Sequence, residues 1–239
     1  MAPRGHDEPD LVEADGRQSV LGLLNWAIAV KRSQVHNNIA RARHRNPEAT
    51  PEQVTRSLER MYVTTLAGTG AVTGAATAAP GVGTGLALTL WGGQTLATFV
   101  RSAVFMLSLA DVHGVPILEV ERRQTLMMGI LLGEAGTATI ARVSERTGKH
   151  WAREVVGNTP LETLRKINRI LGNDFITKYG NTNGIIVLND LVPAVFGAVI
   201  GSGLSFVAAS GAVAASRLAF GAPPTSWPRL TRAAVIPRV

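Results

Sequence analysis

The run MYVTTLAGTGAVTGAATAAPGVGTGLALTLWGGQTLATFV, from Met61 to Val100, decides the fold of this chain. It contains no charged side chain, although 17% of the whole chain is charged. Pro80-Gly81 divides the run into two arms, because proline lacks the helical N–H and glycine permits a chain reversal. Each arm approaches the ~20 residues that a helix needs to cross a bilayer. The run therefore predicts a helical hairpin, either buried as a protein core or inserted in a membrane.

A second uncharged run extends from Leu191 to Ser216. Gly201-Ser202-Gly203 interrupts it, and neither part is long enough to span a bilayer alone. Every Lys and Arg lies outside the two runs. A single span at 191–216 would place the basic C-terminal residues on the opposite side, against the positive-inside rule. We therefore expect a second apolar hairpin, bent between Gly201 and Gly203, rather than a third span.

Both runs contain small residues at the spacing that lets helices approach closely. Gly70 and Gly74 stand four apart in the first run, and Gly197 and Gly201 do so in the second. We expect the two hairpins to meet at these glycines. The residues predicted for helix packing and membrane contact are Gly70, Gly74, Pro80, Gly81, Gly197, Gly201 and Gly203.

The composition suits one domain with an anionic partner. The 239 residues carry a formal net charge of +7, with a pI near 10.7. Nucleic acid and anionic lipid headgroups are the two candidate partners for such a chain. No recognition motif or aromatic-basic pattern supports nucleic acid, which we exclude. The absence of Cys excludes disulfides, thiolate metal sites and Cys nucleophiles, and fits a reducing compartment.

The chain divides into a polar, disordered stretch at 1–16, one helical domain at 17–220 and a flexible, basic, Pro-rich tail at 221–239. The domain opens with an amphipathic helix from Arg17, whose second half is basic. Such a helix lies on an anionic membrane or packs on a core with its basic face in water. In the first case Arg41, Arg43 and Arg45 contact anionic lipid headgroups.

Start and stop signals predict the remaining helices of an all-α bundle. Thr50-Pro51-Glu52-Gln53 forms a capping box, from which a helix continues into the first uncharged arm, with Glu59 on its solvent side. The second arm ends at the Gly114-Val115-Pro116 stop. Further helices are expected at 118–132, 135–147 and 161–171, the last closed by Gly172, with a short turn at 175–179. The sequence shows no sustained strand alternation.

No pattern of catalytic or metal-binding residues is present. The five His residues lack metal-ligand spacing, and the glycines at 81–85 do not fit a phosphate loop. Glu119 and Glu121 would point to different faces of a helix. We expect no cofactor, no metal and no catalytic set. If the chain were an enzyme acting on lipid, Asp111, His113 and Glu134 would be the residues to test, although a helix end at Gly114 explains the first two.

Several stretches resemble the bacterial EcsC family, over roughly Val54 to Phe220. They are LADVHG at 109–114, ERRQTLMMGILLGE at 121–134 and KINRILGNDFITKYGNTNGIIVLNDLVPAVFGAVIG at 166–201. The resemblance implies a mostly helical, membrane-associated protein, possessing no established catalytic residues to carry over. It also suggests association with a transporter or another membrane complex.

The sequence thus predicts a non-enzymatic protein bound to the cytoplasmic face of the cell membrane through apolar hairpins and basic helices. Two alternatives stay open. One is a soluble all-α module that binds a lipid or another apolar ligand in its core, and the other is an enzyme acting on lipid.

Overall fold

The computed structural model describes residues 21–22, 24–30, 32–44, 46–77, 84–145, 150–179 and 197–228. This part of the chain is almost entirely helical and contains no strand, which confirms the all-α class. Its helices are α2 (Arg32–Arg43), α3 (Pro51–Thr77), α4 (Thr84–Val112), α5 (Val120–Leu132), α6 (Glu134–Ser144), a π-helix (Ala152–Val156), α7 (Leu161–Tyr179) and α9 (Gly197–Phe220).

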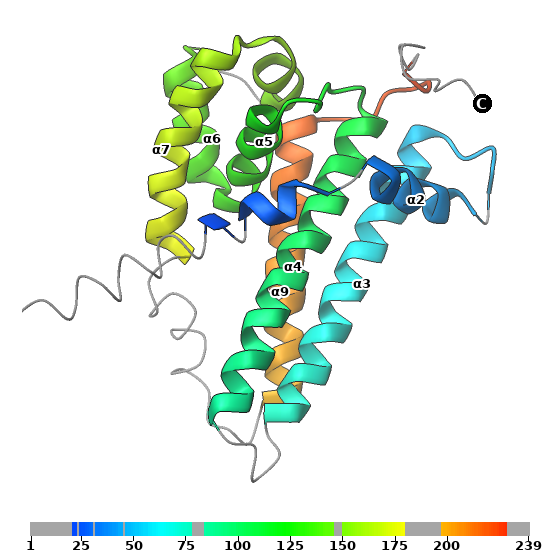
Figure 1. Ribbon diagram of the computed structural model, residues 1–239. Coiled ribbons are helices and arrows are strands. Elements are labelled where there is room, and N and C mark those ends of the chain that lie inside the picture. Colours follow the sequence, from blue (N-terminus) through cyan, green and yellow to red (C-terminus); the bar gives the residue numbers. More distant parts are fainter. Residues whose placement is uncertain are drawn as a thin grey trace, which may run out of the picture.

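Three long helices, α3, α4 and α9, lie side by side along the length of the molecule (Figure 1). Helices α5, α6 and α7 cover one side of their upper half, and α2 lies beside the N-terminal end of α3. The C-terminal end of α3 and the N-terminal ends of α4 and α9 extend beyond these shorter helices. We call these three ends the projecting end of the bundle.

The predicted capping box begins α3. The Thr50 N–H donates to Gln53 Oε1 at 3.0 Å, and the Gln53 N–H donates to Thr50 Oγ1 at 3.3 Å. Two otherwise unpaired donors of the first turn are thereby satisfied, and the helix begins at Pro51 as expected. The predicted bend at Pro80-Gly81, between α3 and α4, lies outside the described residues.

The bend expected between Gly201 and Gly203 is wrong, because α9 passes through both glycines as one helix. Glycine costs a helix only about 1 kcal/mol relative to alanine, which tertiary packing readily outweighs. Here α9 packs along α3 over much of its length. Its small residues Ala209, Ala212, Ser216 and Ala219 are buried at the spacing of one helical face.

The core lies where the upper halves of the long helices meet α5 and α7. The Tyr62 ring of α3 stacks on Phe105 of α4 with centroids 4.3 Å apart, and its hydroxyl shares a 2.9 Å hydrogen bond with Ser102. Phe175 of α7 lies 5.9 Å from Phe99 of α4, measured between ring centroids. Leu164, Ile167 and Leu171 of α7 are fully buried.

Two predicted helix boundaries are wrong. Helix α7 does not close at Gly172 but continues to Tyr179, so Phe175 belongs to the same helix. The single helix expected from Arg17 is broken at residues 29–30, and α2 begins only at Arg32. The Arg123 guanidinium donates from Nη1 to the carbonyls of Ile28 and Val30, at 3.1 and 3.3 Å. It thereby satisfies carbonyls that a helix end leaves unpaired.

Candidate membrane-binding surface

The projecting end of the bundle is built only from uncharged sequence. Arg60 is the last charged residue of α3, Arg101 is the first of α4, and Arg217 is the first of α9. At 1.5 Å per residue, the uncharged lengths are about 25 Å for α3 and α4 and about 30 Å for α9. All three uncharged lengths extend toward the same end of the molecule (Figure 1). In the view of Figure 1, the charged residues of the three long helices therefore lie no lower than Arg60, Arg101 and Arg217.

Helix α9 carries exposed apolar side chains on its outer surface. Phe206 is 52% exposed and Val207 is 66% exposed, within the uncharged part. Leu218, eleven residues beyond Val207, is 50% exposed beside the charged Arg217. Eleven residues are close to three helical turns, so Val207 and Leu218 lie on one face about 16 Å apart. One face of α9 therefore has an exposed apolar side chain in the uncharged part, Val207, and another beside the first charged residue, Leu218.

An ion pair between the buried Glu59 and the exposed Arg217 marks the level at which charge begins. Glu59 of α3 is not on the solvent side as expected, because α9 covers it and its side chain is only 8% exposed. Arg217 donates from Nε to Glu59 Oε1 at 2.8 Å and from Nη2 to Oε2 at 2.7 Å. These hydrogen bonds raise the pKa of Arg217 above its usual value. The pair fixes the antiparallel register of α9 on α3.

The predicted glycine contacts fall largely outside what the structure describes. Gly70 and Gly74 are helical residues of α3, and Gly197, Gly201 and Gly203 are helical residues of α9. The structure does not describe the surroundings of these five glycines. Pro80 and Gly81 lie outside the described residues. Their packing and membrane contact stay predictions.

A close glycine contact that the sequence analysis missed joins α5 to α6. A Cβ built on Gly136 would lie 2.5 Å from the carbonyl oxygen of Gly129 and 2.9 Å from Leu132 Cβ. Between the two helices, Gly133 has φ 67° and ψ −126°, a backbone conformation that favours glycine and ends α5. Gly129 and Gly136 belong to two different helices, so spacing along a single helix does not predict their contact. Sequence offered no signal for it beyond Gly133.

Arg41 and Arg43, two of the three basic residues predicted to bind lipid headgroups, lie far from the projecting end. Arg41 and Arg43 occupy the last turn of α2, near the opposite end of α3, and Arg45 lies outside the described residues. Arg43 donates to the Pro47 carbonyl and sits over the Trp227 ring, 4.9 Å from its centroid. Arg41 borders an open hollow of about 550 Å³ between α2 and α4. The structure does not bring these arginines and the uncharged helix ends to one surface.

The start of the predicted C-terminal tail is packed. Trp227 donates from Nε1 to the Ala49 carbonyl at 3.2 Å, and Pro228 lies against Gly114. Residues 221–228 therefore run across the loop before α3 and the end of α4, while 229–239 lie outside the described residues.

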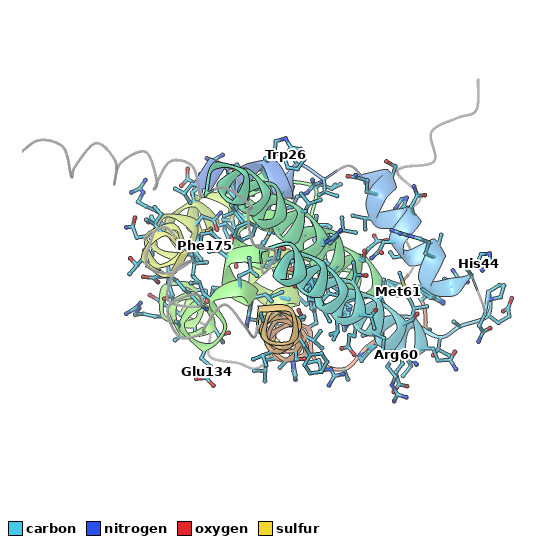
Figure 2. The ribbon with its side chains drawn as sticks, turned by 90° about the horizontal axis from the view of Figure 1, so that it is seen from below. Trp26, His44, Arg60, Met61, Glu134 and Phe175 are labelled. Atoms are coloured by element: carbon cyan, nitrogen blue, oxygen red, sulfur yellow. The ribbon has the colours of Figure 1, made fainter. Side chains whose placement is uncertain are left out.

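Asp111, His113 and Glu134 do not form a site together. His113 is buried against Phe220, with ring centroids 4.9 Å apart, and burial lowers its pKa to about 4. Asp111 instead faces His36 of α2 at 4.0 Å. Glu134 is exposed at the start of α6 and points away from the bundle (Figure 2). Glu119 and Glu121 pair with different arginines, Arg122 and Arg165, as their predicted separation onto two faces requires.

Within the described residues, no group of His, Asp and Glu is arranged to hold a metal ion. No described helix combines the length and the apolar character needed to cross a membrane. Comparison of the chain with protein-family models, with curated proteins and with solved structures gives no match. The resemblance to the EcsC family stays a prediction.

Proposed function

We propose that this protein binds the surface of a lipid bilayer by placing the projecting end of α3, α4 and α9 among the lipids. The observation that carries the proposal is the segregation of charge along these three helices. Their ends share one direction and contain no charged residue over about 25 Å, whereas charges begin together at Arg60, Arg101 and Arg217. A chain with 17% charged residues would place charges at such an end if water surrounded it.

The absence of Cys favours a reducing compartment, and hence the cytoplasmic face of the cell membrane. In this orientation the molecule stands on its projecting end, and α2 and residues 221–228 face away from the lipid (Figure 1). The proposal differs from the sequence-based expectation in one respect. Arg41 and Arg43 do not contact the bilayer that receives the helix ends.

Two matched substitutions on α9 test the proposal. Val207→Glu introduces a charge on the uncharged part, and Leu218→Glu introduces the same charge on the same face about 16 Å away. Both native side chains are at least half exposed, so neither variant buries its new carboxylate in the core. Placing a carboxylate at the centre of a bilayer costs about 2.5–3.5 kcal/mol on insertion scales, and the cost falls toward the interface.

In flotation assays with phosphatidylcholine vesicles, we expect Val207→Glu to lower bound protein at least tenfold and Leu218→Glu to lower it less than twofold. Circular dichroism and thermal unfolding of both variants serve as controls for folding. Equal binding by the two variants, or an unfused wild-type chain that stays out of the vesicle fraction, would overturn the proposal.

A further inference from the structure

A hollow of about 270 Å³ is lined by Leu21, Leu24 and Asn25 together with residues of α5 and α7. One part of its lining is polar, with Asn25, Arg169 and Asn173, and another part is apolar, with Leu21, Met128 and Ile176. No acidic residue lines it. Sites for drug-sized ligands measure about 300–1,000 Å³, so this hollow suits a smaller group.

Three amide side chains that line the hollow bond one another and fix its shape. Asn168 accepts from Thr125 Oγ1 at 2.6 Å and donates to the Glu121 carbonyl at 2.9 Å and to Gln124 Oε1 at 3.3 Å. Gln124 in turn donates from Nε2 to Asn25 Oδ1 at 2.9 Å. Because Asn25 thus uses its oxygen as acceptor, its Nδ2 hydrogens are the groups left to donate.

The groups that remain at the rim are donors of hydrogen bonds. The side chains of Arg169 and Asn173 are exposed, one turn apart on α7, and neither has a partner in the described part of the chain. Arg169 is the one charged residue among those that line the hollow. Together with Asn25, they offer a guanidinium fork and two amide groups to one region of space. This set complements an anion that bears several oxygens.

Gly172 keeps the hollow open. It is buried in α7, yet a Cβ built on it would meet no atom within 4 Å. The sequence predicts a helix end at this glycine, whereas the structure places it inside a continuous helix. Its missing side chain therefore contributes space to the hollow instead of a turn.

We propose that this hollow binds the phosphate ester of a glycerophosphate group, with Arg169, Asn173 and Asn25 donating to the phosphate oxygens. The apolar lining of Leu21, Met128 and Ile176 receives the carbon part of the ester. This inference rests on the proposed membrane binding for one source of the ligand, an anionic phospholipid, while a soluble phosphate ester offers the same chemistry.

The position of the hollow favours the phospholipid. Phe175 lies in the stretch of α7 that lines the hollow (Figure 2). Its ring packs on Phe99, two residues before Arg101 ends the uncharged part of α4. The hollow therefore lies near the level at which the proposed lipid contact ends. Trp26, 62% exposed, lies on the outside of the same segment as Asn25 (Figure 2). Tryptophan is enriched at the interface between membrane and water, where headgroups lie.

Two variants of the full chain test the inference. Gly172→Leu adds a side chain to the hollow at a position where a Cβ would meet no atom within 4 Å, and Arg169→Gln removes the guanidinium. Arg56→Gln is the matched control, because it removes the same charge from an exposed site on α3. Binding is measured to vesicles of phosphatidylcholine alone, to vesicles of equal parts phosphatidylcholine and phosphatidylglycerol, and to glycerol 1-phosphate by calorimetry and NMR.

We expect Gly172→Leu and Arg169→Gln each to lower the preference for phosphatidylglycerol vesicles about tenfold, the effect of losing hydrogen bonds to a charged group. Arg56→Gln should keep the wild-type preference, and binding to phosphatidylcholine alone should not change. Glycerol 1-phosphate binding that Gly172→Leu abolishes, without any vesicle preference, would support the site and assign it to a soluble ester.

The inference is overturned if both variants keep the wild-type preference and the wild-type affinity for glycerol 1-phosphate. Thermal unfolding separates this outcome from misfolding, since a residue other than glycine should not destabilise the middle of α7. The proposed membrane binding fails separately. In that case Val207→Glu would leave vesicle binding unchanged, while the variants in the hollow would still lose the phosphate ester.

Discussion

At the scale of single residues, Glu59 shows how distant sequence determines burial. The periodicity of α3 places it beside Arg56 and Arg60, which are exposed, so sequence alone predicts a solvated carboxylate. The structure covers it with α9, more than 150 positions later in the chain, which supplies Arg217 as its partner. A local pattern contains no information about a helix that arrives from so far away.

We predict that Glu59→Gln lowers the free energy of unfolding by about 1.5–3 kcal/mol, the range for a hydrogen bond to a charged group. The exposed pair of Glu52 and Arg56, spaced i,i+4 on the same helix, provides the control. Glu52→Gln should cost only about 0.3–0.5 kcal/mol. Urea denaturation followed by circular dichroism measures both values. Equal effects would show that the Glu59–Arg217 pair does not connect α3 to α9 energetically.

We predict that the free energy of unfolding depends on pH through His113. Its pKa is about 4 in the folded chain, first because of burial and second because of the nearby Arg153 charge, against about 6.5 in the unfolded chain. Between pH 4 and pH 6.5, His113 is protonated in the unfolded state and neutral in the folded state. Stability is therefore full above pH 6.5 and falls as the pH decreases toward 4, by at most about 3 kcal/mol.

Urea titrations at several pH values measure this loss. His113→Gln removes the titrating group but keeps a polar side chain, so its unfolding free energy should fall less over the same interval. Identical pH slopes for wild type and variant would assign the acid sensitivity to other groups.

At the scale of helices, the sequence predicts boundaries well where a backbone group must be satisfied locally. The Thr50 capping box begins α3 as expected, and α5 ends at the predicted residue 132, where Gly133 follows with a positive φ. A glycine signal is less reliable, because whether a helix ends at a glycine or continues through it depends on the packing of the neighbouring helix. Gly172 and Gly201 suggest ends or bends, yet both lie inside continuous helices. Local signals therefore predict a helix end where a nearby group satisfies the backbone, but they do not predict the packing between helices.

The same substitution at two helical glycines should have opposite effects. We predict that Gly136→Ala destabilises the protein by about 1–3 kcal/mol, because its Cβ would overlap the Gly129 carbonyl. Gly211→Ala, at an exposed site on α9 with nothing within 4 Å, should be neutral or stabilise by up to about 1 kcal/mol. Thermal unfolding of the two variants measures the difference. A Gly136→Ala variant as stable as the wild type would refute the close crossing of α5 and α6.

At the scale of the whole molecule, the arrangement of three helices decides which sequence features act together. The uncharged runs were evident from sequence, but their assembly at one end was not, since it depends on the antiparallel packing of α9 on α3. Because the sequence does not show this packing, it predicts that Arg41 and Arg43 contact the same membrane as the uncharged runs. The structure places them toward the far end of α3, about 40 Å from Thr77 along a 27-residue helix.

This geometry predicts how the protein stands on a membrane. The native chain lacks Cys, so single cysteines can be labelled with an environment-sensitive dye without background. Thr84→Cys marks the start of α4 at the projecting end, and Glu48→Cys marks the exposed loop before α3 at the other end. With vesicles present, the dye at position 84 should shift to the blue, be quenched by brominated lipid and be protected from aqueous iodide. The dye at position 48 should behave as it does in water, because about 40 Å of helix separates the two ends.

Equal quenching of both dyes by brominated lipid would mean that the molecule lies flat, with the exposed side of α9 as its contact. Full iodide access at position 84 in vesicle-bound protein would show that the uncharged helix ends remain in water, and the end-on orientation would have to be abandoned.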